Sequence, residues 1–168
     1  LDLACGYGHC LTGTLQRVSG NGIRGWGVDL DPDAIAIAAS RAQNKGIDNV
    51  SFHVGDVLRP EDYPIDSPDI IVLSGIAQYL QYEQRMELYR LVYECLKKDG
   101  YLLSDYFCDW AQGPVQRWWK RISEEFLSAK LQWLNREEVE EMFSQLPFRE
   151  VRTWYANSNV CLLILARK

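Results

Sequence analysis

The sequence lacks the residue patterns of a metalloprotein, a disulfide-linked protein and a membrane-spanning protein. It has only two histidines, and its five cysteines are odd in number and include no Cys-x-x-Cys pair. A metal site or a disulfide framework is therefore not expected. The longest apolar run, residues 161–166, is far shorter than a membrane span, and no basic region with a hydrophobic stretch opens the chain. We expect no membrane span and a cytoplasmic location.

An excess of positive charge is also missing. The net charge is -5, with 18 basic and 23 acidic residues, which disfavours binding to a phosphate backbone. A local exception is Arg117, Lys120 and Arg121 beside Trp118 and Trp119, a group that could stack on bases or lie at a membrane surface. A simple amphipathic helix explains this group better, so nucleic acid is not the expected partner.

The length and composition indicate one domain over residues 1–168. The chain has 168 residues, 47% of them hydrophobic, which is enough for one substantial core and too few for two. No internal repeat or low-complexity segment is present. Leu1 enters the first expected strand with almost no lead-in and is not a methionine, so we expect the chain to be truncated before that strand.

A short apolar segment running into a glycine turn opens the chain, and Asp29 ends the next apolar run. Gly6 and Gly8 allow a sharp turn and a close ligand approach, and a carboxylate about 20 residues further on can bind ribose hydroxyls. A dinucleotide site would require a third glycine, which falls here at Leu11. Asp2 would also repel a pyrophosphate and suits a cationic ligand, so a dinucleotide-dependent oxidoreductase is a distant alternative.

The segment Asp2–Gly8 resembles the first motif of the class I S-adenosylmethionine (SAM)-dependent methyltransferases, although that family usually has glycine where Ala4 stands. Further motifs at 25–32, 50–57 and 68–75 follow in the order that the family shows. The resemblance implies SAM as cofactor and S-adenosylhomocysteine (SAH) as product. Asp29 would hold the ribose, Asp56 and Val57 the adenine, and Ser74 the methionine moiety. The implied cofactor-binding residues are Asp2, Ala4, Cys5, Gly6, Tyr7, Gly8, Asp29, Leu30, Gly55, Asp56, Val57, Ser74 and Gly75.

The residue pattern taken without the family also predicts an α/β fold. Strands and helices alternate, which favours a Rossmann-like, doubly wound and mostly parallel sheet with ligands beyond the carboxyl ends of its strands. The family would add a terminal antiparallel strand pair. The expected strands are 1–4, 23–29, 50–55, 68–74, 100–107, 147–155 and 159–167, and the expected helices are 9–19, 32–45, 83–98 and 135–145.

The residues around the acceptor are predicted from their places near the carboxyl ends of strands. Methyl transfer requires an aligned acceptor, and a general base only for a neutral hydroxyl. Candidates for a catalytic role are Tyr79, Asp105 and Tyr106, and candidates for the substrate side are His9, Asp109, Trp110 and Trp118. The aromatic-rich segment 106–133 is expected to form a substrate-side insertion, although its tryptophans could equally pack on the sheet. It favours a small aromatic or lipophilic acceptor.

Two other function classes remain open. An acidic domain with exposed tryptophans could methylate a basic protein or another macromolecule, and a non-catalytic SAM-binding module would have the same fold. Methyltransferases that act on bases in nucleic acids usually carry an Asn- or Asp-Pro-Pro-aromatic run after the fourth strand. Here residues 74–79 read Ser-Gly-Ile-Ala-Gln-Tyr. The fold alone does not decide among acceptors.

Overall fold

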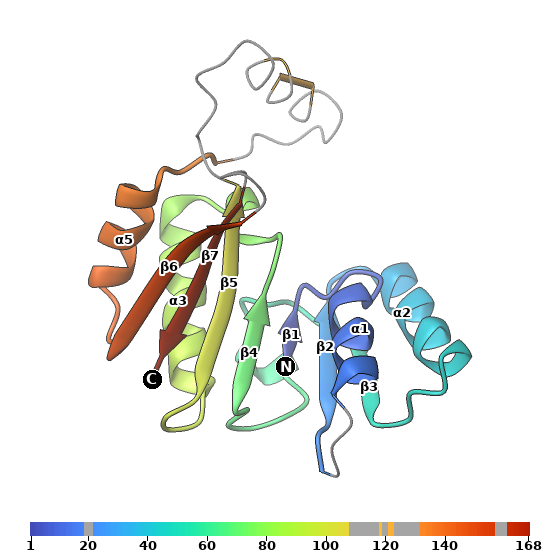
Figure 1. Cartoon of the computed structure of the whole chain (residues 1–168). Helices are drawn as coiled ribbons and strands as arrows, with labels where there is room; N and C mark the ends of the chain where they lie inside the picture. Colours follow the sequence, from blue (N-terminus) through green and yellow to red (C-terminus); the bar gives the residue numbers. More distant parts are fainter. Residues whose placement is uncertain (19–21, 108–117, 119–120, 123–131, 157–160) are drawn as a thin grey trace.

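The computed structural model describes residues 1–18, 22–107, 118, 121–122, 132–156 and 161–168, which form one seven-stranded sheet with helices on both sides (Figure 1). The strands are β1 (Asp2–Leu3), β2 (Gly25–Asp29), β3 (Val50–Val54), β4 (Ile70–Leu73), β5 (Tyr101–Phe107), β6 (Glu150–Ala156) and β7 (Cys161–Arg167). The helices are α1 (His9–Arg17), α2 (Pro32–Asn44), α3 (Tyr82–Cys95) and α5 (Arg136–Ser144), with short 3-10 helices η1 (Pro60–Asp62) and η2 (Ala77–Tyr79).

The strand order is β3-β2-β1-β4-β5-β7-β6. The first five strands pair in parallel, whereas β7 runs antiparallel to both β5 and β6. This arrangement confirms the predicted mostly parallel sheet with a terminal antiparallel pair. Because β1 lies between β2 and β4, the chain reverses its direction of travel across the sheet at β1, which is where open α/β sheets bind ligands.

The helices cover both faces of the sheet, as the alternation of side chains along the strands shows. One face carries Asp2, Gly25, Gly27 and Val72, and the other carries Leu3, Val28, Leu73 and Ser104. A Cβ at Gly25 would lie 2.9 Å from a Leu11 carbon, so the first face packs on α1. The Ser104 hydroxyl is hydrogen-bonded to Tyr89 of α3, so the second face packs on α3.

Local sequence explains where two of the helices begin. The Asp31 side chain accepts the backbone N–H of Asp33 and caps α2, and Pro32 follows at the first helical position. At α5, Asn135 and Glu138 each accept the other's backbone N–H at 2.8 Å, which is a capping box. Asp31 followed by proline, and Asn135 followed by acids, predicted both helix starts correctly.

The helix α3 ends at Cys95, earlier than the predicted end at residue 98. Leu96 has an extended ψ of 138°, and the Lys97 amide donates to the Pro68 carbonyl, which turns the chain towards β5. The Lys168 ammonium donates to the carbonyl of Glu94 in the last turn of the helix and to that of Leu96, the residue after its end. A cation at this position also interacts favourably with the helix dipole.

The main core lies between the sheet and the helices α3 and α5. Leu3, Leu73 and Leu102 are fully buried from the sheet side. Tyr89 of α3 and Phe143 of α5 meet them with ring centroids 4.8 Å apart. Burial of each of these large side chains contributes roughly 1.5–3 kcal/mol to stability. None of the described helices is long and apolar enough to cross a membrane.

Candidate functional site

The loops that follow the first four strands meet at one edge of the sheet. Leu3 pairs with Val28 on one side and Leu73 on the other, and Asp29 pairs with Val54. Because these strands are parallel, their carboxyl ends lie side by side. The predicted cofactor residues of all four loops are therefore brought together at this edge.

The turn after β1 depends on three residues with positive φ: Ala4 at 58°, Gly6 at 51° and Gly8 at 68°. The two glycines serve different purposes. A Cβ at Gly8 would lie 2.9 Å from the Ala38 Cβ and from the Phe52 ring, so this glycine permits close packing. A Cβ at Gly6 would meet no described heavy atom within 4 Å, so Gly6 presents its backbone to open space. Ala4 adopts its left-handed conformation despite carrying a Cβ.

Asp29 connects this turn with the end of β2. One carboxylate oxygen accepts the Gly6 N–H at 2.7 Å, and the other accepts the Asp31 N–H at 3.0 Å. The side chain is half-buried, and its oxygens have further lone pairs that can accept ribose hydroxyls. The next residue, Leu30, is 70% exposed at the same edge.

Asp2 is a buried acid with an unpaired oxygen. Its exposed fraction is 2%, and its Oδ2 has no hydrogen-bond partner among the described residues. Burial, together with the nearby charge of Asp29, raises the pKa of Asp2 to about 7. A cation bound beside Asp2 would pair with this oxygen and would stabilise the charged form of the carboxylate. The residues of this loop thus fit a ligand that carries an ammonium or a sulfonium.

The loop after β3 is held by residues that sequence reasoning missed. The Gly55 amide donates to the Asp29 carbonyl at 2.9 Å, and a Cβ at Gly55 would lie 2.8 Å from the Asp62 Cβ. The Asp62 carboxylate accepts the Asp56 amide at 2.9 Å, and the Tyr63 hydroxyl donates to the Val57 carbonyl at 2.5 Å. The turn formed by η1 brings Asp62 and Tyr63 back onto the loop, and their spacing from residues 55–57 carries no recognised signal.

Asp105 holds the loop after β4. Its two carboxylate oxygens accept the Ser74 hydroxyl and the Gly75 N–H, both at 2.7 Å. Gly75 has a φ of 76°, and a Cβ there would meet no described heavy atom within 4 Å. The Asp105 carboxylate therefore fixes two of the predicted cofactor residues while leaving the backbone of Gly75 accessible.

Tyr106 occupies a different environment from the one predicted. Successive residues of a strand point to opposite faces, so Asp105 and Tyr106 cannot both face the same side of the sheet. Tyr106 is fully buried against α3, and its hydroxyl is hydrogen-bonded to that of Tyr89 at 3.0 Å. The expectation that Tyr106 lines the acceptor side is corrected here, because its hydroxyl lies within the core.

The remaining candidates are placed as follows. Tyr79, in η2, is 39% exposed at the end of the loop that follows β4, and Tyr7 and His9 are exposed around the start of α1. Trp118 is 60% exposed. Asp109, Trp110 and most of the predicted insertion 106–133 lie outside the described residues.

Cys5 is not suited to act as a nucleophile. Burial is the main cause that raises the pKa of its thiol to about 12, and the charges of Asp2 and Asp29 add to the effect. Cys10, Cys95 and Cys161 are also free thiols. Within the described ranges, no group of three or more His, Cys, Asp or Glu side chains is placed to hold a metal ion.

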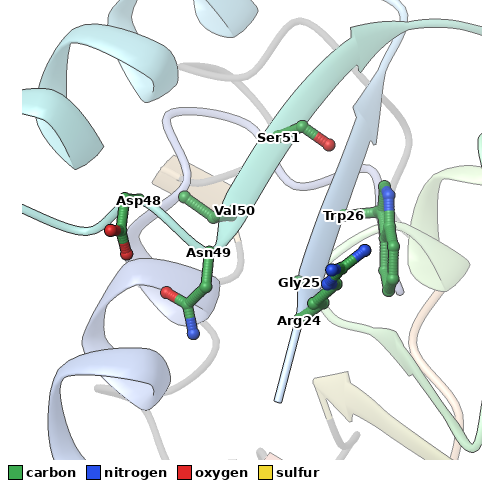
Figure 2. A pocket seen from close by; sticks show the side chains of 7 residues that line it. All are labelled: Arg24, Gly25, Trp26, Asp48, Asn49, Val50 and Ser51. Atoms are coloured by element: carbon green, nitrogen blue, oxygen red, sulfur yellow. The ribbon is translucent and has the colours of Figure 1, made fainter. Parts of the chain in front are cut away.

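A separate hollow lies at the opposite edge of the sheet, where β2 and β3 begin. Figure 2 shows Arg24 and Trp26 on one side of it and Asp48 and Asn49 on the other. The Asn49 side chain already donates to the Ile23 carbonyl at 2.8 Å. This hollow is distant in the fold from the four loops, and it takes no part in the site described above.

Comparisons with known proteins agree with this architecture. A family of methyltransferase domains matches residues 1–154. The uncharacterized methyltransferase YcgJ of Bacillus subtilis (strain 168) is 32% identical over 108 residues, which cover 64% of this chain and 40% of that protein. An O-methyltransferase family 2 protein from Planctomyces limnophilus, solved in complex with apigenin, has a TM-score of 0.80 at 23% identity, covering 99% of this chain and 49% of that one.

A second solved structure is similar at lower identity. Magnesium protoporphyrin IX methyltransferase (ChlM) from Synechocystis PCC 6803, solved with bound SAH, has a TM-score of 0.75 at 13% identity, covering 99% of this chain and 72% of that one. The chain spans 40% of the length of YcgJ and about half of the Planctomyces protein. Because the family match covers most of the sequence, the chain belongs to the methyltransferase domain family and has the class I SAM-dependent fold that its first motif predicted.

Proposed function

We propose that this chain binds SAM across the four loops and transfers its methyl group to a small-molecule acceptor. The observation that carries the proposal is the unpaired Oδ2 of buried Asp2, which lies in the strand that leads into the Gly6 turn. A ligand that combines a nucleoside with a cationic amino acid suits both features. SAM is such a ligand, and when bound it supplies an electrophilic methyl group on its sulfonium.

The chain's own residues would bind and orient this ligand. Asp29 would accept the ribose hydroxyls, because its carboxylate is already fixed by the Gly6 and Asp31 amides. Asp56 would accept from the adenine amino group beside Val57. Ser74 and Gly75, held by Asp105, would lie along the methionine moiety. Such fixed positioning can supply roughly 7–11 kcal/mol of the barrier reduction for an in-line transfer.

The acceptor side is proposed to be built around Tyr79 and Asp105, with His9 nearby at the start of α1. Asp105 can accept a further hydrogen bond on either oxygen, so it could orient an acceptor hydroxyl as well as the loop. A small acceptor is supported by the similar proteins, since one was solved with apigenin and another acts on magnesium protoporphyrin IX. The aromatic residues of segment 106–133 favour an aromatic or lipophilic compound.

The first experiment is a calorimetric titration of the chain with SAM and with SAH, with NAD as the control ligand. Binding of SAM and SAH without binding of NAD is the expected result. Asp48→Asn, which changes an exposed acid where β3 begins, far from the four loops, should bind SAM and SAH as the unaltered chain does, and it serves as the control for acid variants at the site. Tight binding of NAD alone, or no binding of SAM to folded protein, would reject the cofactor assignment.

The acceptor is then identified with SAM labelled on its methyl group. We expect label in phenolic or lipophilic small molecules and none in bulk protein or nucleic acid. Transfer into protein would favour a macromolecular acceptor. Tight SAM binding with no transfer to any acceptor would favour a binding module.

A further inference from the structure

A cationic side chain is buried in the core between the sheet and α3. Arg85, in the first turns of α3, is 1% exposed, and its Nη2 donates to the Leu80 carbonyl at 2.8 Å. Its Nε has no hydrogen-bond partner among the described residues, and no described carboxylate forms an ion pair with it. The guanidinium carbon lies 5.6 Å from the centroid of the Tyr106 ring.

Two buried tyrosines connect Arg85 with the sheet. The Tyr89 hydroxyl is hydrogen-bonded to Ser104 at 2.9 Å and to Tyr106 at 3.0 Å, and the Ser104 hydroxyl donates to the Leu73 carbonyl at 3.0 Å. Burial raises the pKa of Tyr89 to about 12 and that of Tyr106 well above its ordinary value. Both phenols therefore keep their protons, and neither supplies a negative charge to Arg85.

These side chains hold the loop between β4 and α3 from the sheet face that packs on α3. Ser104 holds the carbonyl of Leu73, just before the loop, and Arg85 holds the carbonyl of Leu80 near its end. Between them, the Gln78 side chain donates to the Gly75 carbonyl at 2.9 Å. Asp105 holds the same loop from the other face of the sheet. The loop that carries the proposed methionine contacts and Tyr79 is thus fixed at both ends.

Burying the charge of Arg85 in the core is energetically unfavourable. A buried charge without a charged partner costs several kcal/mol, and replacing such groups by apolar residues of similar volume is often neutral or stabilising. A cation–π contact with Tyr106 and one carbonyl contact offset only part of this cost. Packing alone does not explain why an arginine stands at this position, whereas its hydrogen bond to the Leu80 carbonyl does.

We propose that Arg85 is a positioning residue that sets the geometry of the loop 74–80, and through it the binding of the amino-acid end of the cofactor. The inference rests on the proposed SAM site. Arg85 acts through Leu80 and Tyr106 and does not touch the ligand. Its effect should therefore depend on whether the ligand has an amino-acid end.

The test compares two ligands by calorimetry: SAH, which contains the amino-acid end, and 5′-methylthioadenosine, which lacks it. We expect Arg85→Met to weaken SAH binding by about fivefold, the equivalent of one lost hydrogen bond, with little change for 5′-methylthioadenosine. Its midpoint of thermal unfolding should be unchanged or raised. Arg85→Lys keeps a cation that can donate to Leu80, and should recover most of the SAH affinity. Arg90→Met, on the exposed side of the same helix, is the matched control.

The outcomes separate this proposal from the proposed function. If the unaltered chain binds neither ligand, the cofactor assignment fails and the positioning role fails with it. If the chain binds both and Arg85→Met weakens both equally or neither, only the positioning role is rejected. Should Arg85→Met not fold, Arg85→Gln removes the same charge with a shorter polar side chain, and the same difference between the two ligands is required.

Discussion

The carboxylate of Asp29 accepts the backbone N–H of Gly6 at 2.7 Å, and this contact joins the loops that follow β1 and β2. The two residues are 23 positions apart in the chain. The contact orients the carboxylate towards the glycine turn, and the open side of Gly6 leaves space beside it. A nucleoside bound there would meet an acceptor that is already fixed, so little side-chain entropy would be lost on binding.

Asp29→Ala is therefore expected to weaken SAM and SAH binding by about tenfold or more, because the two ribose hydroxyls lose their shared acceptor. Calorimetric titration measures the change. The free energy of unfolding should barely change, since Asp29 is half-buried and its amide partners lie near solvent. Asp29→Asn keeps one oxygen acceptor, so its affinity for SAM and SAH should lie between that of the unaltered chain and that of Asp29→Ala. An unaltered dissociation constant in Asp29→Ala would reject the ribose assignment.

Asp2→Asn should change how stability depends on pH. Burial raises the pKa of Asp2 from 3.8 to about 7, so between these values the folded protein holds a proton that the unfolded chain has lost. Asp2 therefore contributes a fall of up to about 4 kcal/mol in the free energy of unfolding as pH rises from about 4 to 7, and no further fall above pH 7. The asparagine variant lacks this contribution.

Denaturant unfolding at pH 5 and pH 8 measures the effect of Asp2 directly. The asparagine variant should gain stability relative to the unaltered chain as the pH rises, and it should bind SAH more weakly at pH 8 because the ligand's cation loses its carboxylate. Parallel pH profiles for the two proteins would show that Asp2 is not held neutral by the fold.

Ala4→Gly tests whether the first turn is strained. Ala4 has a φ of 58°, a conformation that costs an L-residue roughly 1–2 kcal/mol and costs glycine nothing comparable. Against this gain, the greater conformational entropy of glycine in the unfolded chain lowers the free energy of unfolding by about 0.4–1 kcal/mol. The free energy of unfolding should therefore stay the same or rise by about 1 kcal/mol, and SAH binding should not weaken. A clear loss of stability in denaturant titrations would contradict the expected strain.

Much of the fold was predictable because local signals agree with tertiary structure. Glycine turns, the proline after Asp31 and the apolar strand segments act over a few residues, and the order of strands follows from the family's motif order. The placement of Asp29 beside the glycine turn could be predicted because its spacing from that turn is set by one strand-helix-strand unit, and its contact with the Gly6 N–H confirms the placement. The match of residues 1–154 to a family of methyltransferase domains confirmed the resemblance to class I methyltransferases.

The parts that were missed depend on contacts between distant segments. Arg85 reads as an ordinary helix residue in the sequence, and only its packing beneath Tyr106 shows that it is buried. The opposite orientations of Asp105 and Tyr106 follow from the strand period, but the sheet face that meets the ligand depends on where α3 packs. The role of Asp62 depends likewise on the turn made by η1.

Asp105→Asn separates a positioning role for Asp105 from a role as general base. Asparagine can keep both contacts, because its amide oxygen can accept the Gly75 N–H and its amide nitrogen can donate to the Ser74 hydroxyl. If Asp105 only holds the loop, Asp105→Asn should bind SAH and transfer methyl groups nearly as well as the unaltered chain. Asp105→Ala removes both contacts and should weaken SAH binding by about tenfold, with a smaller loss in Ser74→Ala, which removes only one. Calorimetry of these variants measures SAH binding without an acceptor. If Asp105→Asn binds SAH normally but loses methyl transfer at every pH tested, Asp105 acts on the acceptor and does not merely hold the loop.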